Sequence, residues 1–552
     1  MKKLFLTLLL ILSLQSLSYA LPVDSTTLVD GHYNSSITLS ANKVYLLKGF
    51  VYMEKNTTLT IPAGTIIRGD FNTKGTLIIQ RGAQINAVGT VSQPIIFTSN
   101  KPAGQRATGD WGGLIILGRA GINTVSGADS NLIEGLPPEV TPAYYGGQPR
   151  NDADNSGTLK YCRFEFGGIN LTGVSGNEIN GLTLGGVGSG TTIDYIQISY
   201  AGDDAVECFG GTVNLKHMIA YKTLDDCWDT DNGYRGYCQF LLAVSDSSIA
   251  DQSKSNGFEC DNNANSPNNY NSPRTQVTYS NVTMIGPKKT LSTVINPLFG
   301  VGAHLRRNNL TSIYNTIIMG WPKGPLFDGT GVQTAMKNDT SKFRSNIIAG
   351  CPVIADTAGG SGVMGSAVTF VQTSGYNNRT YTNNTDVGLA NPYGFYGGTP
   401  DFRPTGGSAA LSGGNFTYPN LANSFFTPTT YVGAFDGTTD WTAGWANWDP
   451  QNFVIGIKTI SSEVPAAYKL SQNYPNPFNP TTKISFSVVK SGFVSLKVYD
   501  MTGKEVSVLV NETLGNGTYS ADFNAANLTS GVYFYTLKTD NFSETKKMML
   551  VK

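Results

Sequence analysis

Hydrophobic residues along most of the chain fall in short runs that glycine and polar residues separate. Between residues 59 and 117, β-branched runs such as Thr65-Ile66-Ile67 and Leu77-Ile78-Ile79 recur at roughly ten-residue intervals. Runs this short are typical of strands, and no long helical periodicity or heptad pattern accompanies them. The pattern predicts an all-β protein built either as a sandwich or as a solenoid.

A repeat in the middle of the chain favours the solenoid. Residues 200–221 (YAGDDAVECFGGTVNLKHMIAY) stand directly before residues 222–243 (KTLDDCWDTDNGYRGYCQFLLA), and both copies are 22 residues long. The phrase NGFECDNN at residues 256–263 starts the pattern again. A period of this length fits one coil of a parallel β-helix, in which stacked coils complete the core. We therefore expect a single right-handed parallel β-helix over residues 22–455.

The last part of the chain alternates apolar and polar residues with a period of two. Residues 484–488 (ISFSV) and 494–498 (VSLKV) follow this pattern, and turn residues such as Asn516-Gly517 separate the runs. Several short strands in so few residues predict a small Ig-like β-sandwich over residues 466–552. Residues 456–465 are then expected to be a linker.

Composition narrows the range of partners. The 39 basic and 39 acidic residues give no net charge, and only 14% of residues are charged. This balance argues against nucleic acid or an anionic membrane as the partner. The 63 glycines fit a turn-rich β protein.

The N-terminus has the pattern of a signal peptide. Met1-Lys2-Lys3 is a short basic region, residues 4–17 form an apolar run, and Ser18-Tyr19-Ala20 supplies small residues for cleavage. We expect residues 1–20 to be removed on export. No other segment reaches about 18 consecutive apolar residues, so no transmembrane segment is expected in the mature chain.

Three motifs near the C-terminus carry a resemblance to a known family. They are NYPNPFNP at residues 473–480, VYDMTGK at 498–504 and LTSGVY at 528–533. Together they resemble the type A C-terminal sorting domain of the type IX secretion system, over residues 466–552. The resemblance implies recognition by the secretion machinery and removal of the domain by a sorting peptidase. It also implies that the cargo is attached to surface lipopolysaccharide or released, so the protein is expected to be secreted or on the outer cell surface.

The cargo has a looser resemblance of its own. Over residues 45–450 it is similar to uncharacterised secreted right-handed β-helix proteins, in the phrases GTIIRG, GTLIIQRGA, PIIFTSN, GDWGGLII and DDAVECFGGTVN. That resemblance implies a fold and no particular activity, because many functions share the β-helix.

Acidic residues concentrate in the repeat. Residues 200–261 contain eleven acidic and four basic residues. If the coils stack in register, Glu207 lies over Asp229 and Asp204 over Asp226, at a strand spacing of about 4.8 Å. Opposed like charges destabilise a sheet, and a hard cation such as Ca²⁺ would offset them. The predicted Ca²⁺ ligands are Asp204, Glu207, Asp225, Asp226, Asp229, Asp231 and Glu259. The alternative is that these carboxylates cap turns and face water.

An enzyme is the second hypothesis for the cargo. Paired aspartates could support glycoside hydrolysis, and Lys222 or Arg235 could be the base of a polysaccharide lyase. The aspartates in question are Asp203, Asp204, Asp225 and Asp226. No lyase or hydrolase signature stands out, and His217 lies in an apolar phrase that predicts a core position. We therefore assign no catalytic residue and favour a binding, adhesive or structural surface protein, with glycans as one class of partner.

Two further groups of residues have open roles. The six cysteines are expected to be buried small hydrophobic residues or to form one or two disulfides, which export permits; they are Cys162, Cys208, Cys227, Cys238, Cys260 and Cys351. Residues 352–440 have weak periodicity and are expected to form loops and irregular final coils. The three tryptophans in residues 441–448 are expected to seal the C-terminal end of the solenoid, with a sugar-stacking platform as the alternative.

Overall fold

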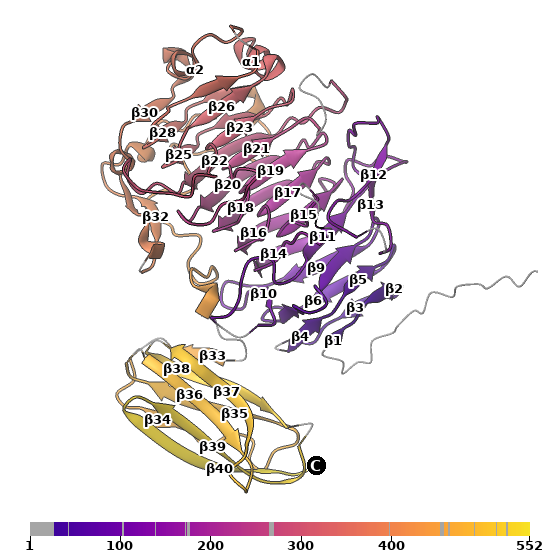
Figure 1. Ribbon diagram of the computed structural model, residues 1–552, viewed down its shortest axis with the longest axis vertical. Helices are drawn as coiled ribbons and strands as arrows, with labels where there is room; N and C mark the ends of the chain where they lie inside the picture. The colour runs from indigo at the N-terminus through magenta and orange to yellow at the C-terminus, as the bar shows by residue number, and fades with distance from the viewer. Residues whose placement is uncertain are drawn as a thin grey trace, which may run out of the picture. The chain divides into compact units, whose positions relative to one another are not determined.

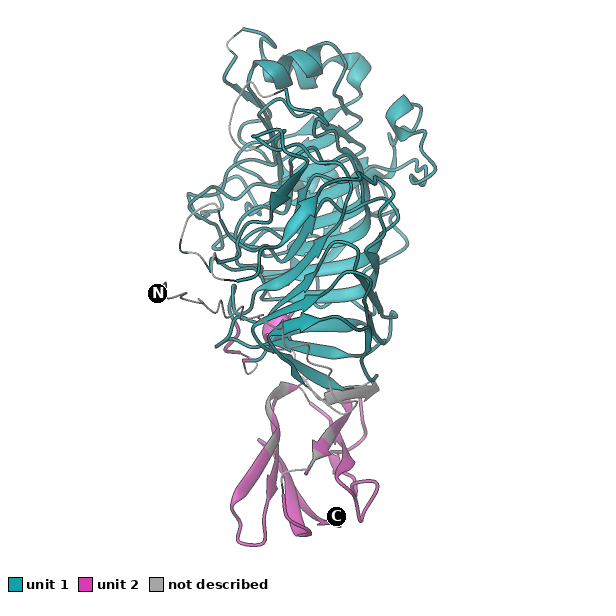
Figure 2. Cartoon of the chain, turned by 90° about the vertical axis from the view of Figure 1, so that its right-hand side faces the viewer, with its two compact units in different colours: residues 1–100, 107–448 teal, residues 101–106, 449–552 magenta. Residues whose placement is uncertain are grey.

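The structure is a computed structural model of the chain (Figure 1). It describes residues 27–552 apart from residues 42, 102–103, 138–139, 172, 174–176, 264–269, 361, 397, 453–456, 462–463, 491, 515 and 526–527. The expected signal peptide at residues 1–20 lies outside the described residues. The chain forms two compact units: residues 1–100 with 107–448, and residues 101–106 with 449–552 (Figure 2).

The first unit is a right-handed parallel β-helix, as the repeat predicts. Its coils stack into two long parallel sheets of 17 and 11 strands, which we call sheet 1 and sheet 2. Sheet 1 contains β1 (Thr27–Leu28), β3 (Ile37–Thr38), β4 (Val44–Leu47), β6 (Thr58–Ile61), β7 (Ile66–Gly69), β9 (Gln84–Val88), β10 (Ile95–Ser99), β14 (Gly157–Glu165), β16 (Thr192–Ser199), β18 (Asn214–Tyr221), β20 (Tyr237–Val244), β22 (Thr278–Ile285), β24 (Ser312–Tyr314), β25 (Ile317–Met319), β27 (Phe343–Arg344), β28 (Ile347–Ala349) and β30 (Arg379–Tyr381).

Sheet 2 has one short strand from each coil. Its strands are β2 (Gly31–Tyr33), β5 (Phe50–Met53), β8 (Thr76–Ile79), β11 (Gly113–Leu117), β15 (Leu182–Gly185), β17 (Val206–Phe209), β19 (Trp228–Asp231), β21 (Phe258–Cys260), β23 (Ala303–Leu305), β26 (Pro325–Asp328) and β29 (Asp356–Ala358). Alternate residues of each strand point into the coil, so that Val206, Trp228 and Phe258 stack in the core. All six cysteines are buried and free, which confirms their expected role as small apolar residues and excludes the expected disulfides.

Long strands of sheet 1 bend at one residue in each coil. Tyr161, Tyr195, His217 and Phe240 occupy the left-handed region, with φ between 48° and 58°. Their rings stack on the outer face of the sheet, with centroids 4.5, 4.3 and 5.1 Å apart in succession. His217 is therefore packed between two rings outside the coil, and its expected position in the core was wrong. Its Nδ1 lies 2.8 Å from Asp194 Oδ1.

Two short helices, and not tryptophans, close the last coils. They are α1 (Thr330–Lys337) and α2 (Ala367–Val371), which lie beside the final strands of the β-helix (Figure 1). Val332 and Met336 of α1 and Val371 of α2 are buried in the same core cluster as the coils. The expected tryptophan seal was wrong. Trp445 is buried against the outer face of sheet 1, and Trp441 and Trp448 pack partly buried in the same cluster, so the three rings help to attach the chain to that sheet.

Coils stop earlier than expected, at β30, and the chain then turns back along sheet 1. We call residues 382–448 the return segment. Amide side chains of the sheet bind its backbone: Gln239 bonds both N–H and C=O of Thr427, at 2.8 and 2.7 Å, and Gln197 does the same with Asn447 at 2.7 Å each. Short elements within and next to this segment are η1 (Ser374–Tyr376), η2 (Asn384–Val387), β31 (Leu389–Asn391), η3 (Gly394–Tyr396), β32 (Asp401–Pro404), η4 (Ala409–Leu411), η5 (Pro419–Leu421) and η6 (Pro450–Asn452).

An insertion covers the outer face of sheet 2 over the early coils. Its hairpin consists of β12 (Ser130–Leu132) and β13 (Tyr144–Gly146). Ile133 and Tyr145 pack there against outward apolar residues of the sheet, including Ile78 and Ile115. The hairpin is thus held by apolar contacts and ends where the sheet surface becomes acidic.

The second unit is a β-sandwich, as the period-two pattern predicts. One antiparallel sheet contains β33 (Ile457–Ser461), β38 (Gly517–Asn524), β35 (Thr481–Val488) and β34 (Lys469–Leu470). The other contains β37 (Glu505–Leu514), β36 (Gly492–Tyr499), β39 (Gly531–Thr539) and β40 (Phe542–Leu550). Because β33 pairs with β38, part of the expected linker at 456–465 is a strand of the sandwich. No helix among the described residues has the length and apolar character to cross a membrane.

Candidate functional site

Sheet 2 places the acidic residues of successive coils in one outward column. Pairing is in register from Thr183 to Glu207, then Asp229, then Glu259, then His304. The predicted stacking of Glu207 over Asp229 is confirmed. The same column is apolar in the earlier coils that the hairpin covers. The part of the sheet that the hairpin leaves uncovered therefore begins at the carboxylates.

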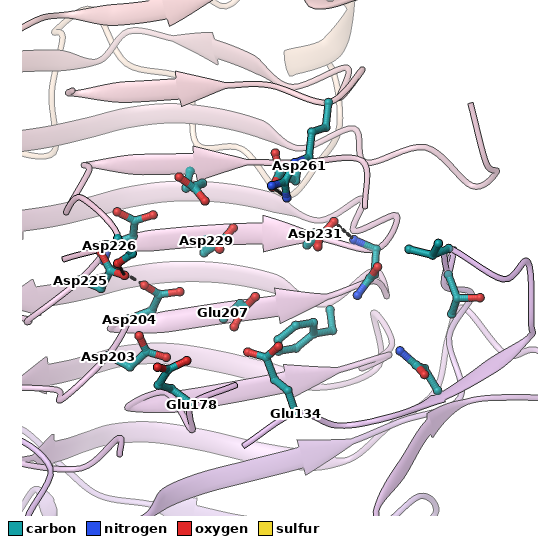
Figure 3. A pocket seen from close by; sticks show the side chains of 18 of the residues that line it. Glu134, Glu178, Asp203, Asp204, Glu207, Asp225, Asp226, Asp229, Asp231 and Asp261 are labelled. Carbon is teal, nitrogen blue, oxygen red and sulfur yellow. Dashed lines mark hydrogen bonds and ion pairs between the residues drawn. The ribbon is translucent and has the colours of Figure 1, made fainter. Parts of the chain in front are cut away.

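These carboxylates form the floor of a groove with a volume of about 650 Å³ (Figure 3). Twelve acidic side chains and two arginines line it, beside Tyr145 and Phe209. The acidic residues are Glu134, Glu178, Asp203, Asp204, Glu207, Asp225, Asp226, Asp229, Asp231, Asp251, Glu259 and Asp261, and the arginines are Arg306 and Arg307. All seven residues predicted as Ca²⁺ ligands therefore lie in one groove.

A wall of the groove comes from segments far away in the sequence. Thr124, Asn131 and Glu134 belong to the hairpin insertion, and asparagines hold this insertion in place. Asn123 Nδ2 donates to Asn262 Oδ1 at 3.0 Å, and Asn263 Nδ2 donates to Asn123 Oδ1 at 3.1 Å. Because buried amides satisfy one another in this way, the wall has a fixed position relative to the coils.

Two of the predicted ligands have a structural role as well. Asp204 Oδ1 accepts the backbone N–H of Asp226 at 2.8 Å, and Asp226 Oδ1 accepts the backbone N–H of Asn256. Asn256 Oδ1 in turn accepts the N–H of Val301 at 2.9 Å. This ladder of side chains joins consecutive coils at the turn before sheet 2. Its last member, Asn256, shows that an amide oxygen can replace a carboxylate oxygen as the acceptor.

Among the described residues, ion pairs with arginine and histidine lie at one end of the column. Arg306 pairs with Glu259 and, at 2.8 Å, with Asp261, and Arg307 pairs with Asp261 at 2.7 Å. His304 Nδ1 lies 3.5 Å from Glu259 Oε1. Burial alone would raise the pKa of Glu259, but the hydrogen bond from His304 and the charge of Arg306 outweigh it and hold this pKa below its usual range. Glu259 is consequently the least available of the predicted ligands.

Seven other carboxylates of the groove lack such a direct ion pair within the described residues, although Arg306 lies near enough to lower the pKa of Asp229 in part. Among the described residues no Lys, Arg or His forms an ion pair with the carboxylates of Asp203, Asp204, Glu207, Asp225, Asp226, Asp229 or Asp231. Glu207 accepts a hydrogen bond from Asn180 Nδ2 at 2.7 Å, whereas Asp229 Oδ1 is a buried atom with no hydrogen-bond partner in the described part of the chain. Such a buried acceptor is costly to leave unpaired.

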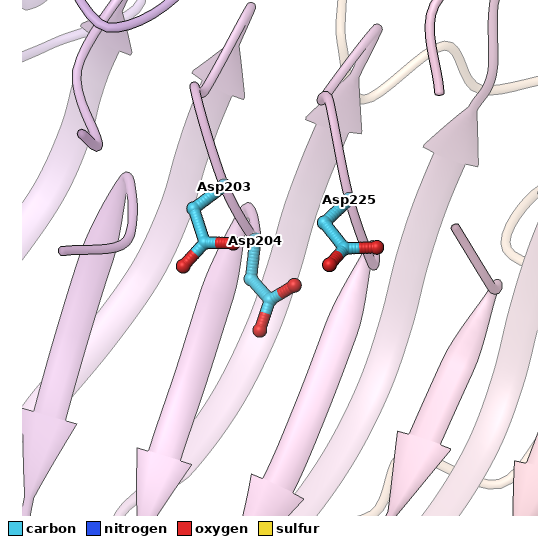
Figure 4. Close-up of side chains that lie close together, drawn as sticks. All are labelled: Asp203, Asp204 and Asp225. Atoms are coloured by element: carbon cyan, nitrogen blue, oxygen red, sulfur yellow. The ribbon is translucent and has the colours of Figure 1, made fainter. Parts of the chain in front are cut away.

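Three groups of carboxylates converge closely enough to share one ion. In each group one oxygen from every member lies within 4.8 Å of the others. The groups are Asp203, Asp204 and Asp225 (Figure 4); Asp204, Glu207 and Asp229; and Asp226, Asp229 and Glu259. Oxygen donors of this kind are the ligands that Ca²⁺ takes in proteins, so the residues present fit a hard divalent cation.

Burial and mutual repulsion raise the pKa values of these carboxyls. Burial, reinforced by neighbouring carboxylates, raises the pKa of Asp204, Glu207 and Asp229 well above their usual range. Burial likewise raises the pKa of Asp225 to about 7 and that of Glu134 to about 8. The groove must therefore hold protons or cations at neutral pH, because so many buried charges cannot stay uncompensated.

Sequence reasoning missed several groove residues for identifiable reasons. Glu134 and Glu178 lie in segments outside the repeat, where no signal links them to the coils. Arg306 and Arg307 could have been found, because AHLRRNN at 303–309 continues the phrase FECDNN of the preceding coil. The two suggested lyase bases are elsewhere: Lys222 pairs with Asp246 and Arg235 pairs with Asp152, and neither lines the groove.

Comparison with known proteins places both units. Residues 31–388 match the pectate-lyase like beta helix domain, and residues 472–552 match the secretion system C-terminal sorting domain. The first match spans more than half of the chain, so the protein belongs to the pectate-lyase-like β-helix family. It is a cargo of the type IX secretion system, exported to the cell surface or into the medium.

Individual relatives add little to the family assignment. A crystal structure of full-length tailspike protein 2 from the Escherichia coli O157:H7 bacteriophage CAB120 is 10% identical, with a TM-score of 0.17. The alignment covers 92% of this chain and 64% of the tailspike chain, so the protein spans less than two thirds of that structure's length. No curated protein is a significant match.

Proposed function

We propose that the acidic groove binds Ca²⁺ and that the protein is a cation-dependent binding or adhesive protein of the cell surface. The observation that carries this proposal is that the carboxylates of Glu207 and Asp229 stack on each other in the groove, and that neither forms an ion pair within the described residues. A hard cation removes the repulsion between them and supplies a partner for the orphaned Asp229 Oδ1.

The central group, Asp204, Glu207 and Asp229, is the best of the three as a first ion site. Its members are close together, and none has an ion pair within the described part of the chain. Asp204 and Glu207 are only 6% and 7% exposed, so bound water contributes less there than at an open surface. Extracellular Ca²⁺ modules bind the ion with a Kd of the order of 10⁻⁴ to 10⁻³ M, and we expect the same range here.

A bound cation would also make the groove suitable for glycans. Hydroxyl or carboxylate oxygens of a sugar can complete the coordination of the ion, and Tyr145 and Phe209 line the same groove. The ligand is then a cell-surface or environmental glycan whose binding is lost when the cation is chelated.

Calorimetric titration of the chelator-treated protein with Ca²⁺ tests the ion site. We expect binding by the unchanged protein and at least about tenfold weaker binding by Asp229→Asn, which corresponds to about 1.4 kcal/mol. Asp129→Asn is the matched control, because Asp129 is an exposed carboxylate outside the groove. The proposal fails if the unchanged protein neither binds Ca²⁺ nor gains thermal stability from it.

A polysaccharide-active enzyme is the second candidate. The supporting observation is that Asp225 lies close to Asp203 and Asp204, with one oxygen of each within 4.8 Å of the others. Burial raises the pKa of all three carboxyls, so the group can supply a proton donor at neutral pH. A glycan panel assayed for new reducing ends or unsaturated products, with Asp225→Asn as the inactive variant, distinguishes this candidate from simple binding.

A further inference from the structure

The start of the sorting domain exposes an aromatic ring that the domain itself does not use. Tyr474 is 82% exposed, and Pro475, Asn476 and Pro477 after it are exposed as well. Among the described residues the Tyr474 side chain has no hydrogen bond and no ring contact. We call these four residues the tyrosine–proline loop.

Buried residues hold the loop from its N-terminal side. Asn473 is only 2% exposed, and its side-chain Nδ2 donates to Pro475 O and to Thr482 Oγ1, both at 3.0 Å. Its backbone N–H donates to the hydroxyl of Tyr535 at 2.8 Å. Thr482 Oγ1 also donates to Pro475 O at 2.8 Å, so the turn is closed by side chains from two strands.

Further bonds fix the loop at its other side. Phe478 is buried in the sandwich core, and its backbone N–H donates to Met549 O at 2.9 Å. The N–H of Met549 returns a bond to Asn476 Oδ1 at 2.9 Å. The backbone of Tyr474 exchanges two bonds with Lys483, at 2.9 and 3.0 Å. An exposed ring on so constrained a backbone loses little conformational entropy when it binds a partner.

We propose that the tyrosine–proline loop is the surface by which a protein of the secretion machinery holds the sorting domain. The loop lies inside residues 472–552, which match the sorting domain, and recognition by that machinery is the role of the domain. Tyrosine is among the residues that dominate binding energy at interfaces, and exposed proline rings fit aromatic-lined grooves. The loop carries no charge, so the partner surface is an apolar, aromatic-lined pocket.

Export of the full chain in a bacterium with a type IX secretion system tests the proposal. The variant Tyr474→Ala is expected to reduce the exported fraction at least about fivefold, with retention in the periplasm and an unchanged melting temperature. Tyr474→Phe keeps the ring and is expected to be exported normally. Met501→Ala is the matched control, because Met501 is a 68% exposed apolar residue elsewhere on the same domain.

Three results would overturn the proposal. Normal export of Tyr474→Ala would show that the ring is not recognised, and a lower melting temperature of that variant would show a structural role instead. An equal loss of export with Met501→Ala would show a general sensitivity of the domain. None of these outcomes depends on the acidic groove, and Asp229→Asn is expected to be exported like the unchanged protein.

Discussion

At the scale of single residues, the groove combines two kinds of carboxylate. Asp204 and Asp226 join consecutive coils through their hydrogen bonds to backbone N–H groups. Within the described residues Asp229 Oδ1 has no hydrogen-bond partner, and the neighbouring carboxylates repel its charge more than Arg306 attracts it, so its cost to the fold must be offset by a ligand or by a proton. One residue type thus stabilises the fold at one position, whereas at another it is free for the cation binding that we propose.

Substitutions of Asp226 separate these two effects. Asp226→Ala leaves the N–H of Asn256 without its acceptor and is expected to cost about 1–3 kcal/mol. Asp226→Asn keeps an acceptor, as Asn256 does in the next coil, and removes a charge from the cluster. In chelator, thermal unfolding should rank Asn at or above the unchanged protein and Ala below it. Equal melting temperatures for Asn and Ala would contradict a structural role for the ladder.

The raised pKa values predict how stability depends on pH without a cation. The folded state holds protons on Asp225 and Asp231 up to about pH 7, whereas the unfolded chain releases them near the ordinary carboxyl pKa of about 4. The folded state therefore binds more protons between these limits, and stability falls as pH rises through them. A tenfold change in proton affinity corresponds to about 1.4 kcal/mol.

In melting experiments with chelator we expect the melting temperature to fall by several degrees between about pH 5 and pH 8. Added Ca²⁺ should reduce the fall, because the ion replaces the protons. In chelator, Asp225→Asn should give a smaller fall in melting temperature, because the asparagine has no proton to lose as the pH rises. A melting temperature that rises over this interval would contradict uncompensated carboxylates in the folded groove.

At the scale of elements, the return segment is a cover bound to the outer face of sheet 1. Trp445 packs edge-on against Tyr161 and Tyr195 with ring centroids 5.9 and 6.1 Å away, and its Nε1 donates to Trp441 O at 2.8 Å. Together with the amide bonds from Gln197 and Gln239, these contacts replace strand pairing along a segment that has little regular structure.

Loss of the Trp445 ring should therefore loosen the whole segment. Trp445 is 1% exposed, and truncation of a buried tryptophan to alanine costs about 3–5 kcal/mol. We expect Trp445→Ala to lower the melting temperature and to speed protease cleavage within residues 382–448. Val294→Ala removes a side chain that is 91% exposed and should change neither quantity. Unchanged cleavage in Trp445→Ala would show that the amide bonds alone hold the cover.

The sequence could predict what its periodic patterns and motifs encode, which includes the coils, the sandwich and the sorting domain, but it could not predict contacts between segments without a pattern. Stacking of Glu207 on Asp229 follows from a 22-residue period, because a coil of fixed length forces the register. The return segment has no period, and its partners Gln197 and Gln239 are about 190 to 250 residues away in sequence. Glu134 reaches the groove only because an insertion packs on apolar residues of earlier coils, which is a tertiary effect.

At the scale of the molecule, the two units have separate roles. The sorting domain accounts for export, and the β-helix carries the groove and has its own core. The sandwich has a separate core built from strands of both of its sheets. The proposed binding by the groove therefore needs no residue of the sorting domain.

Separate cores predict separate unfolding. Scanning calorimetry of the full chain should show two transitions, because no residue belongs to both core clusters. A chain that ends at residue 448 lacks the whole sandwich but retains every coil and the return segment. It should lose one transition and keep the other within a few degrees, and Ca²⁺ should raise only the transition that remains. A single transition in the full chain, or a large shift of the remaining one, would mean that the sorting domain stabilises the β-helix.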